Sequence, residues 1–393
     1  MKTVYLDHCA TTAIHPDVLE MMHPFMHNSF GNPSSIHALG RMAKEAIEEA
    51  RRRVADLIGA DTSEIIFTSG GTEANNLAIQ GIAYASKDRG NHIITSSIEH
   101  HAVLKTCQYL ERNGFEVTYL PVDHHGLVNP ENVKKVLTGK TILISVMHAN
   151  NEVGTIEPVE DIGRIAADRS IPFHTDAVQS AGKLPLDVKE LPVDLLSLSG
   201  HTFYGPKGVG ALYIRDGIRI NPLFHGGNQE KGIRSGTENV AAVVGLGKAC
   251  ELAKASAPAL MDEIRKLRDL LQERISTAVP DLKINGHPVF RLPNILSVSV
   301  PGLTGETILR DLDERDIAVS SGSACTSHLV ETSHVLSAMG LPKEIAQGTL
   351  RMSLGIMNTA NEIEYAATCF AEVIEKLKVL SGIENSLGSR RCY

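Results

Sequence analysis

A strand, a glycine turn and a helix start stand together at residues 65–76, which read IIFTSGGTEANN. Such a junction points free backbone N–H groups, and the positive end of a helix dipole, at an anion. Thr72 adds a hydroxyl next to Gly71. The run matches neither GxGxxG nor GxxxxGK[ST], so we expect no dinucleotide or Walker-type site. The pattern favours a single bound phosphate, although a plain βα turn with a Ser/Thr cap explains the glycines as well.

A second group of candidates lies at residues 174–179, which read HTDAVQ. Asp176 stands just past the carboxyl end of an expected strand, where α/β sheets bind ligands. An isolated aspartate there usually caps the next helix. Combined with a phosphate turn, it can instead hold the protonated ring nitrogen of pyridoxal phosphate.

Cys325 follows a run of small polar residues, SSGSA at 320–324, which predicts an exposed mobile loop. A structural cysteine prefers apolar surroundings, whereas a thiol that collects sulfur in one place and delivers it in another needs a mobile loop. The other five cysteines, at positions 9, 107, 250, 369 and 392, are widely spaced and form no CxxC. For most of them we expect a reduced thiol that acts as a small buried hydrophobe.

Short β-rich runs alternate with helical patterns through the first two-thirds of the 393 residues. Strands are expected at 65–68, 92–96, 116–122, 141–149, 172–176, 195–199 and 208–215, with helices at 41–58, 72–85 and 158–168. Several strands are almost continuously apolar, as in sheets covered on both faces. The fold class predicted is therefore α/β, with a mainly parallel sheet between helices.

The pattern changes after about residue 255. A charged helix is expected at 259–278, strands near 282–285 and 295–300, and a last helix after the capping box Thr359-x-x-Glu362. We predict a large cofactor-binding domain over 15–255, and a smaller α+β domain from 1–14 and 256–393 that carries Cys325. The polar segment 386–393 is predicted to be either a frayed tail or part of a docking surface.

Composition excludes several classes of protein. Lys plus Arg is 38 and Asp plus Glu is 46, a net charge of −8, which argues against nucleic-acid binding through bulk positive charge. No run approaches the roughly 18 apolar residues of a membrane helix, and the first residues lack the apolar core of a signal peptide. We expect a soluble, cytoplasmic protein with no membrane partner and no direct contact with nucleic acid.

Read in order, the motifs resemble those of cysteine desulfurases of the IscS/NifS type, a class V aminotransferase family, over essentially the whole chain. The matching segments are Tyr5-Leu6-Asp7, Ala10-Thr11-Thr12, Phe30-Gly31-Asn32-Pro33-Ser34-Ser35, Thr68-Ser69-Gly70, Thr72-Glu73, Glu99-His100, Asn150-Asn151-Glu152-Val153-Gly154, Tyr204-Gly205-Pro206-Lys207-Gly208, Arg234-Ser235-Gly236-Thr237, Ser320-Ser321-Gly322-Ser323-Ala324-Cys325-Thr326-Ser327, Arg351 and Ser353-Leu354-Gly355. The resemblance implies a fold-type I, aspartate aminotransferase-like homodimer that uses pyridoxal phosphate.

It also implies a role for individual residues. The phosphate would be held by Gly71, Thr72, Ser199 and His201, with Thr237 contributed across the dimer; Asp176 would pair with the ring nitrogen, and Asn151 and Gln179 would bond the polar edge of the ring. His100 would stack on the ring and take part in catalysis with Cys325. Arg351 would bind the carboxylate of L-cysteine, since a guanidinium fork suits that group. Cys325 would take the substrate sulfur as a persulfide.

One departure from the family pattern bears on the chemistry. The family has a Schiff-base lysine after the histidine of a Ser-Gly-His-Lys segment, and here that segment reads Ser199-Gly200-His201-Thr202. A threonine neither bonds the cofactor covalently nor moves the substrate Cα proton, and losing a positioned acid–base group costs roughly 10²–10⁴ in rate. Lys207 is near in sequence, but the family also carries it, and we expect the Gly-Pro turn to direct it elsewhere.

Two explanations of Thr202 stay open: a lysine replaced on purpose to trap a complex, or a natural member that has lost this chemistry. The unusual Cys9, and Ile356 where many relatives have arginine, favour the second slightly. Two functions follow. One is a cysteine desulfurase of iron–sulfur cluster assembly that passes a Cys325 persulfide to a scaffold. The other is a catalytically silent homologue, with pyridoxal phosphate non-covalent or absent, that docks an IscU-type scaffold and lends Cys325 as sulfur acceptor or as ligand of a shared iron–sulfur cluster.

Overall fold

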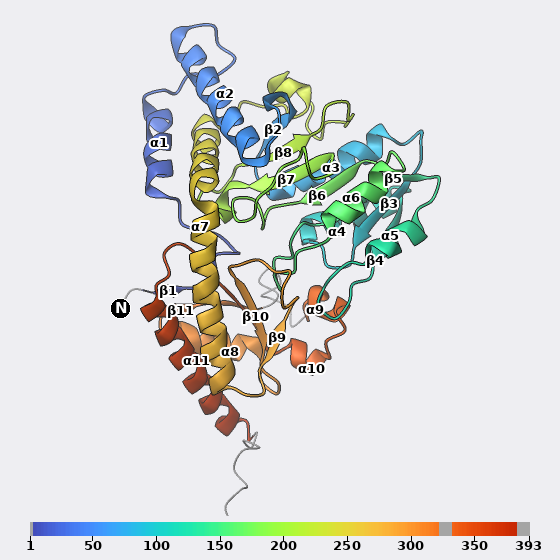
Figure 1. The fold of residues 1–393 in the computed structure, drawn as a ribbon. Helices are drawn as coiled ribbons and strands as arrows, with labels where there is room; N and C mark the ends of the chain where they lie inside the picture. The colour runs from blue at the N-terminus through green and yellow to red at the C-terminus, as the bar shows by residue number, and fades with distance from the viewer. Residues whose placement is uncertain (1–2, 322–331, 383–393) are drawn as a thin grey trace, which may run out of the picture.

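The computed structural model describes residues 3–321 and 332–382. Figure 1 shows a larger α/β part and a smaller part below it, with the long helix α7 (Val240–Ala278) running through both. The predicted Cys325 loop and the predicted docking tail lie outside the described residues.

A seven-stranded sheet forms the centre of the larger part. Its order is β2 (Ile65–Thr68), β8 (Gly210–Ile214), β7 (Leu195–Ser199), β6 (Phe173–Asp176), β5 (Thr141–Ser145), β3 (His92–Ser96) and β4 (Glu116–Leu120). Only β8 runs antiparallel to its neighbours; the other pairs are parallel. The predicted α/β class with a mainly parallel sheet is confirmed.

Helices cover both faces of this sheet (Figure 1). They are α1 (Pro16–His27), α2 (Ala38–Ile58), α3 (Gly71–Ala85), α4 (His101–Arg112), α5 (Pro130–Val136) and α6 (Val159–Ala167), with short 3₁₀ turns at Thr62–Glu64, Gly200–Thr202 and Gln229–Gly232. One apolar cluster joins α2, α6 and α7 to the sheet, and a second joins α3 and α4 to it. Two covered faces explain why the strands read as continuous apolar runs.

The smaller part is built on an antiparallel sheet of β12 (Ser320–Ser321), β13 (Thr349–Ser353), β10 (Ile295–Ser299) and β9 (Lys283–Asn285). Its helices are α8 (Gly305–Asp313), α9 (His334–Ala338), α10 (Lys343–Ala346) and α11 (Ala360–Leu380), and the predicted capping box at Thr359 and Glu362 opens α11. The first strand, β1 (Val4–Tyr5), pairs in parallel with β11 (Ile317–Ala318). The first residues of the chain therefore join the smaller part, which is otherwise built from the last third of the sequence.

The predicted start of a helix at residue 259 is wrong, because α7 begins at Val240 and continues through Pro258. A proline inside a helix removes one backbone hydrogen bond, so the sequence pattern favours a helix that starts next to Pro258 rather than one that contains it. Packing on both sides of it outweighs that loss: Leu246 lies in the core of the larger part, and Leu271 in that of the smaller. The predicted boundary at 255 falls inside this helix, and the division into two domains stays a prediction.

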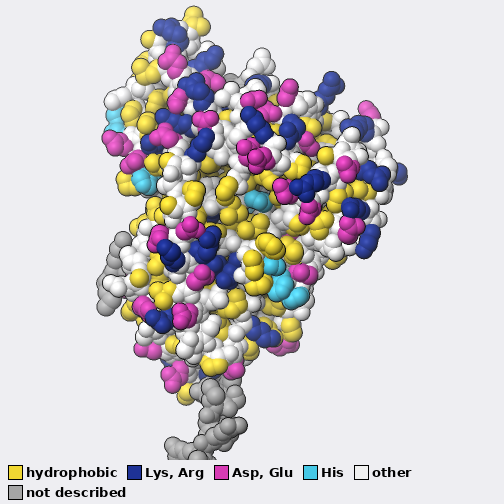
Figure 2. Space-filling model, viewed as in Figure 1, with side chains coloured by type: hydrophobic (Ala, Val, Ile, Leu, Met, Phe, Trp, Pro, Cys, Tyr) yellow, Lys and Arg dark blue, Asp and Glu magenta, His cyan; other side chains and the backbone are white. Residues whose placement is uncertain are grey.

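Within the described residues, no helix is long and apolar enough to cross a membrane. On the face shown in Figure 2, acidic and basic side chains are interspersed. That distribution agrees with the modest net charge of −8.

Candidate active site

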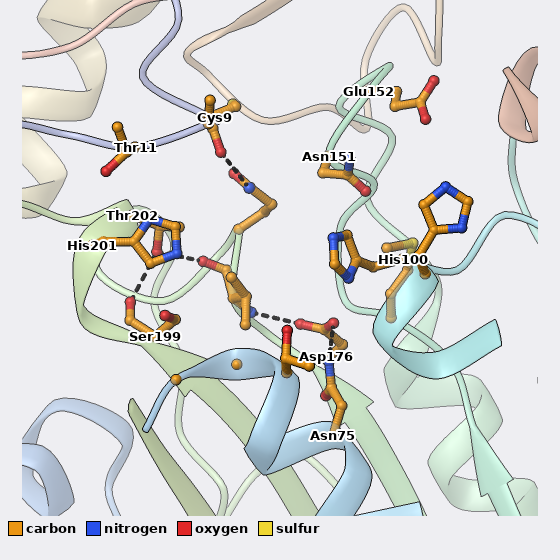
Figure 3. A pocket seen from close by; sticks show the side chains of 18 of the residues that line it. Cys9, Thr11, Asn75, His100, Asn151, Glu152, Asp176, Ser199, His201 and Thr202 are labelled. Atoms are coloured by element: carbon orange, nitrogen blue, oxygen red, sulfur yellow. Dashed lines mark hydrogen bonds between the residues drawn. The ribbon is translucent and has the colours of Figure 1, made fainter. Parts of the chain in front are cut away.

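A cavity of about 730 Å³ lies beyond the carboxyl ends of β6 and β7, between the two parts of the molecule. Several stretches of chain form its wall, among them the N-terminal segment around Cys9, the start of α3, the loop with Asn151 and Glu152, the turn after β6 and the segment 199–208 (Figure 3). Arg351 of β13 also lines it. Nine of the predicted site residues line it: Gly71, Thr72, His100, Asn151, Asp176, Gln179, Ser199, His201 and Arg351.

The start of α3 has the shape of an anion cradle. Gly70, just before the helix, has φ +147°, a value that favours glycine, and a Cβ on Gly71 would lie 2.6 Å from Val178 Cγ2. Ser199 Oγ is buried at the same place and has no hydrogen-bond partner. Glu73 accepts the Ser69 N–H at 2.8 Å and a hydrogen bond from Arg234 Nε at 2.9 Å. Free helix N–H groups beside an unpaired hydroxyl fit a phosphate.

Asp176 is a buried carboxylate at the floor of the cavity. Its oxygens accept hydrogen bonds from Asn75 Nδ2 at 2.6 Å and from the Val178 N–H at 2.9 Å. Burial raises the pKa of Asp176, and His100 acts against that rise. A protonated ring nitrogen would supply the missing opposite charge. Sequence reasoning missed Asn75, which holds this carboxylate from inside α3.

The upper wall of the cavity carries the residues that were predicted to surround the pyridine ring of a cofactor. His100 caps α4, and its Nδ1 accepts the Ala102 N–H at 3.1 Å, which fixes the imidazole at the cavity edge. Gln179 Nε2 donates to the Cys9 carbonyl at 3.0 Å, while its Oε1 is buried without a partner. Asn151 points into the same space (Figure 3).

Arg351 enters the cavity from β13. Its Nη1 donates to the Asn151 carbonyl at 2.9 Å and its Nη2 to Asp7 Oδ1 at 2.7 Å, while Nε is buried and unpaired. Burial opposes the guanidinium charge, but Cys9 and Asp7 outweigh it and raise the pKa of Arg351. The guanidinium is thus fixed and charged, with Nε left for a ligand.

Thr202 stands where the family has its lysine. Its side chain is buried, and Oγ1 lies 2.8 Å from the Val178 carbonyl and 3.0 Å from the Ser199 carbonyl, so the hydroxyl is already bonded. The expectation that Lys207 points elsewhere is wrong, because Lys207 lines the cavity. The reason is the turn itself: the Gly205 N–H bonds the Gly200 carbonyl at 2.9 Å and folds this segment back.

Two predicted residues are not in the cavity of this single chain. Thr237 is exposed and does not line it, and Cys325 lies outside the described residues. The chain after that segment does reach the site, since Thr332, Ser333 and His334 line the cavity. Ser333 Oγ donates to Glu152, and His334 Nε2 to the Glu99 carbonyl at 2.9 Å.

The comparisons with known proteins agree with this geometry. The family model described as aminotransferase class-V matches residues 4–366. The chain belongs to that family. A protein named cysteine desulfurase IscS from Dictyoglomus turgidum is 52% identical over 97% of this chain and 96% of its own, and one from Methanosarcina thermophila is 53% identical over 97% and 94%.

Solved structures give the same result. A "NIFS-like protein" is 42% identical with a TM-score of 0.90, covering 95% of this chain and 100% of its own. A structure titled "SspA in complex with cysteine" is 43% identical with a TM-score of 0.80, covering 90% of this chain and 99% of its own. Within class V, the chain is thus a member of the IscS/NifS group with the fold-type I architecture, and this family works with pyridoxal phosphate.

Three features of the cavity fit that cofactor, and one does not. The unpaired Ser199 hydroxyl lies at the cradle, the buried Asp176 carboxylate lacks a cation, and Gln179 Oε1 is unpaired. At position 202 the fit fails, because a bonded threonine hydroxyl replaces an amine. Residue 202 therefore supplies no amine for a covalent bond to pyridoxal phosphate.

Glu99 lies behind the cavity, and the pH dependence of stability tests whether its buried carboxyl group is protonated. Its Oε1 accepts from Ser96 Oγ at 2.6 Å and from the Met147 N–H at 2.9 Å, Oε2 is buried without a partner, and burial raises its pKa to about 8. The folded chain holds a proton there that the unfolded chain, with a pKa near 4.5, releases. The free energy of unfolding therefore contains a contribution from this proton that is fully present below about pH 4.5. This contribution, at most about 5 kcal/mol, is lost as the pH rises towards about 8.

We expect Glu99→Gln, which mimics the protonated acid, to weaken this dependence on pH. Urea unfolding at several pH values measures it: the stability of the variant relative to the unsubstituted protein should increase from pH 5 to pH 8. Glu160→Gln, at an exposed position of α6, is the control and should show no such trend. Parallel pH profiles for Glu99→Gln and the unsubstituted protein would contradict a buried protonated carboxyl.

Proposed function

We propose that this protein is a cysteine desulfurase of iron–sulfur cluster assembly, in the cytoplasm, whose turnover is limited by Thr202. The convergence of the anion cradle, Asp176 and Arg351 on one cavity carries the proposal. The names of the 52% and 53% identical relatives support it, as does the 43% identical neighbour solved with cysteine.

Each residue has a proposed part. The cradle of Gly71, Thr72, Ser199 and His201 holds the phosphate; Asp176 pairs with the ring nitrogen, Asn151 and Gln179 bond the edge of the ring, and His100 stacks on it. Arg351 Nε binds the α-carboxylate of L-cysteine. When bound, pyridoxal phosphate draws electrons from the substrate Cα and so eases loss of its proton. Thr202 cannot accept that proton, and Cys325 receives the sulfur.

The proposed assembly is a homodimer in which Thr237, exposed in the single chain, reaches the neighbouring site. The proposed recipient of the sulfur is an IscU-type scaffold. Thr202 also favours the second candidate function, a silent homologue that docks the scaffold and supplies Cys325 as sulfur acceptor or cluster ligand. A pull-down in which the dimeric, reduced protein fails to retain the scaffold would contradict both forms of the partnership.

Binding of pyridoxal phosphate tests the shared part of the proposal. Titration followed by calorimetry should show a saturable site in the unsubstituted protein. Asp176→Ala should weaken binding about 10- to 100-fold, because a charged hydrogen bond to the ring nitrogen contributes about 1.5–3 kcal/mol. Asp168→Ala, at an exposed position after α6, is the control. Equal affinities of both variants would remove Asp176 from the site.

A further inference from the structure

The outer edge of strand β2 is covered by a buried ion pair in place of another strand. β2 stands at one end of the seven-stranded sheet and pairs with β8 on one side. On its open edge, the Phe67 N–H donates to Glu230 Oε2 at 2.8 Å, and Arg51 Nη1 donates to the Ile65 carbonyl at 2.8 Å. The two side chains thus bond backbone groups that an edge strand otherwise leaves unpaired.

Arg51 and Glu230 are joined by two parallel hydrogen bonds. Arg51 Nη2 donates to Glu230 Oε1 at 2.6 Å and Nη1 to Oε2 at 2.9 Å, and each residue is 7% exposed. The guanidinium also lies over the Phe67 ring, 4.8 Å from its centroid. Separating a buried pair leaves both charges uncompensated, so this contact holds the segments of its two residues together firmly.

Glu230 belongs to a turn with a strained backbone. Glu230, Lys231 and Gly232 follow one another with φ values of +45°, +59° and +75°. Residues other than glycine rarely adopt positive φ, and such a conformation persists only where surrounding contacts hold it. The Glu230 carboxylate makes one such contact, and Lys231 Nζ makes another by donating to the Ser63 carbonyl. Both fasten the turn to β2 and to the residues that lead into β2.

The turn leads directly to residues of the proposed cofactor site. Two residues after Gly232, Arg234 Nε donates to Glu73 Oε1 at 2.9 Å, and Glu73 accepts the Ser69 N–H at the start of the anion cradle. Thr237, which is proposed to reach the neighbouring site, follows three residues later. β2 itself ends at Thr68, directly before the same cradle. The ion pair therefore joins the two segments that lead to the phosphate.

We propose that Glu230, paired with Arg51, is a positioning residue for the phosphate site. It fixes the strained turn on the edge of β2 and thereby sets both the anion cradle and the segment that carries Thr237. The inference rests on the proposed function, which supplies the phosphate and the neighbouring subunit. Glu230 does not line the cavity, so it acts through the Phe67 N–H on one side and through Arg234 on the other.

Hydrogen exchange followed by mass spectrometry tests this positioning on the full-length chain without cofactor. Glu230→Gln keeps an acceptor for the Phe67 N–H but loses the charge that pairs with Arg51. Peptides over residues 66–73 and 228–237 should exchange at least about tenfold faster, because losing a hydrogen bond between charged groups frees the turn. Peptides of α5, which lies beside β4 at the opposite end of the sheet, should exchange as in the unsubstituted protein.

Glu364→Gln is the matched control, because it removes the same charge from a half-exposed ion pair in which Glu364 Oε1 lies 2.9 Å from Arg274 Nη2. It should change the exchange of neither segment. Arg51→Lys keeps the charge without the fork; it should reproduce the pattern of Glu230→Gln, and it decides the question if that variant does not fold. Equal acceleration of every peptide, α5 included, or no acceleration in the two segments, would overturn the proposal.

The affinity for pyridoxal phosphate, measured by calorimetry, tests the connection between the turn and the cofactor. The Kd of Glu230→Gln should rise at least about tenfold, and that of Glu364→Gln should not change. An unchanged Kd in a Glu230→Gln chain whose two segments exchange faster would overturn the role in the phosphate site. An unsubstituted protein that binds no pyridoxal phosphate would instead contradict the proposed function. The two failures are thus distinguishable.

Discussion

Thr202→Lys is expected to raise the rate of alanine and sulfide formation from L-cysteine by at least about 10²-fold. The side chain of residue 202 lines the cavity, so a lysine there supplies the missing amine to the bound cofactor and accepts the Cα proton. The substitution breaks the Thr202 hydroxyl bonds to the Val178 and Ser199 carbonyls, a loss of about 1 kcal/mol that a folded chain tolerates.

Thr202→Met is the matched control, because it fills similar space without an amine. It should bind pyridoxal phosphate and stay as slow as the unsubstituted protein. An unsubstituted protein as fast as Thr202→Lys would show that another group replaces the lysine. A folded, cofactor-loaded Thr202→Lys variant with no gain would show that Thr202 is not what limits turnover.

Cys325→Ser is expected to abolish persulfide formation and transfer to the scaffold while leaving folding and dimerisation unchanged. The small polar residues around Cys325 indicate no packed core for the thiol to support. Radiolabelled sulfur from L-cysteine, followed on Thr202→Lys protein with and without Cys325→Ser, measures the transfer.

Cys250→Ser gives the opposite pattern. Cys250 lies in α7 and is fully buried in the core of the larger part, so a hydroxyl there costs about 1–3 kcal/mol of stability, and sulfur transfer should persist in the folded fraction. Cluster assembly that continues with Cys325→Ser would remove the role given to that thiol and leave the docking of the scaffold intact.

The alternation of strands and helices predicted the central sheet because period and apolarity are local properties of sequence. The end of β5 was predicted four residues too late for a reason that is not local. After Ser145 the pairing with β3 stops, although the Val146 and His148 N–H groups still bond the His174 and Asp176 carbonyls of β6. The Asn150 N–H then bonds the Thr155 carbonyl at 2.8 Å and turns the chain into the loop that carries Asn151 and Glu152. An apolar run does not show where pairing stops.

Site residues that belong to a local sequence motif could be predicted from the sequence. Site residues whose position depends on a partner far away in the sequence could not. Asp176 and Ser199 end strands β6 and β7, Gly71 begins α3 just after β2, and the sheet brings all three to one edge. The pairing of Arg351 with Asp7 joins positions 344 residues apart, so no pattern reports it. Lys207 was misplaced because its direction depends on how Gly205 packs against Gly200. Such contacts depend on tertiary structure.

Borohydride reduction of the cofactor-loaded protein, followed by peptide mass spectrometry, tests most directly whether the cavity holds pyridoxal phosphate without a lysine bond. Reduction fixes any lysine–cofactor bond permanently. The unsubstituted protein should release its cofactor intact, with no label on Lys207 or Lys183, and Thr202→Lys should carry the label at position 202. Stoichiometric label on Lys207 of the unsubstituted protein, lost in Lys207→Met, would contradict the account, since Lys207 would then be the family's missing lysine in a new place.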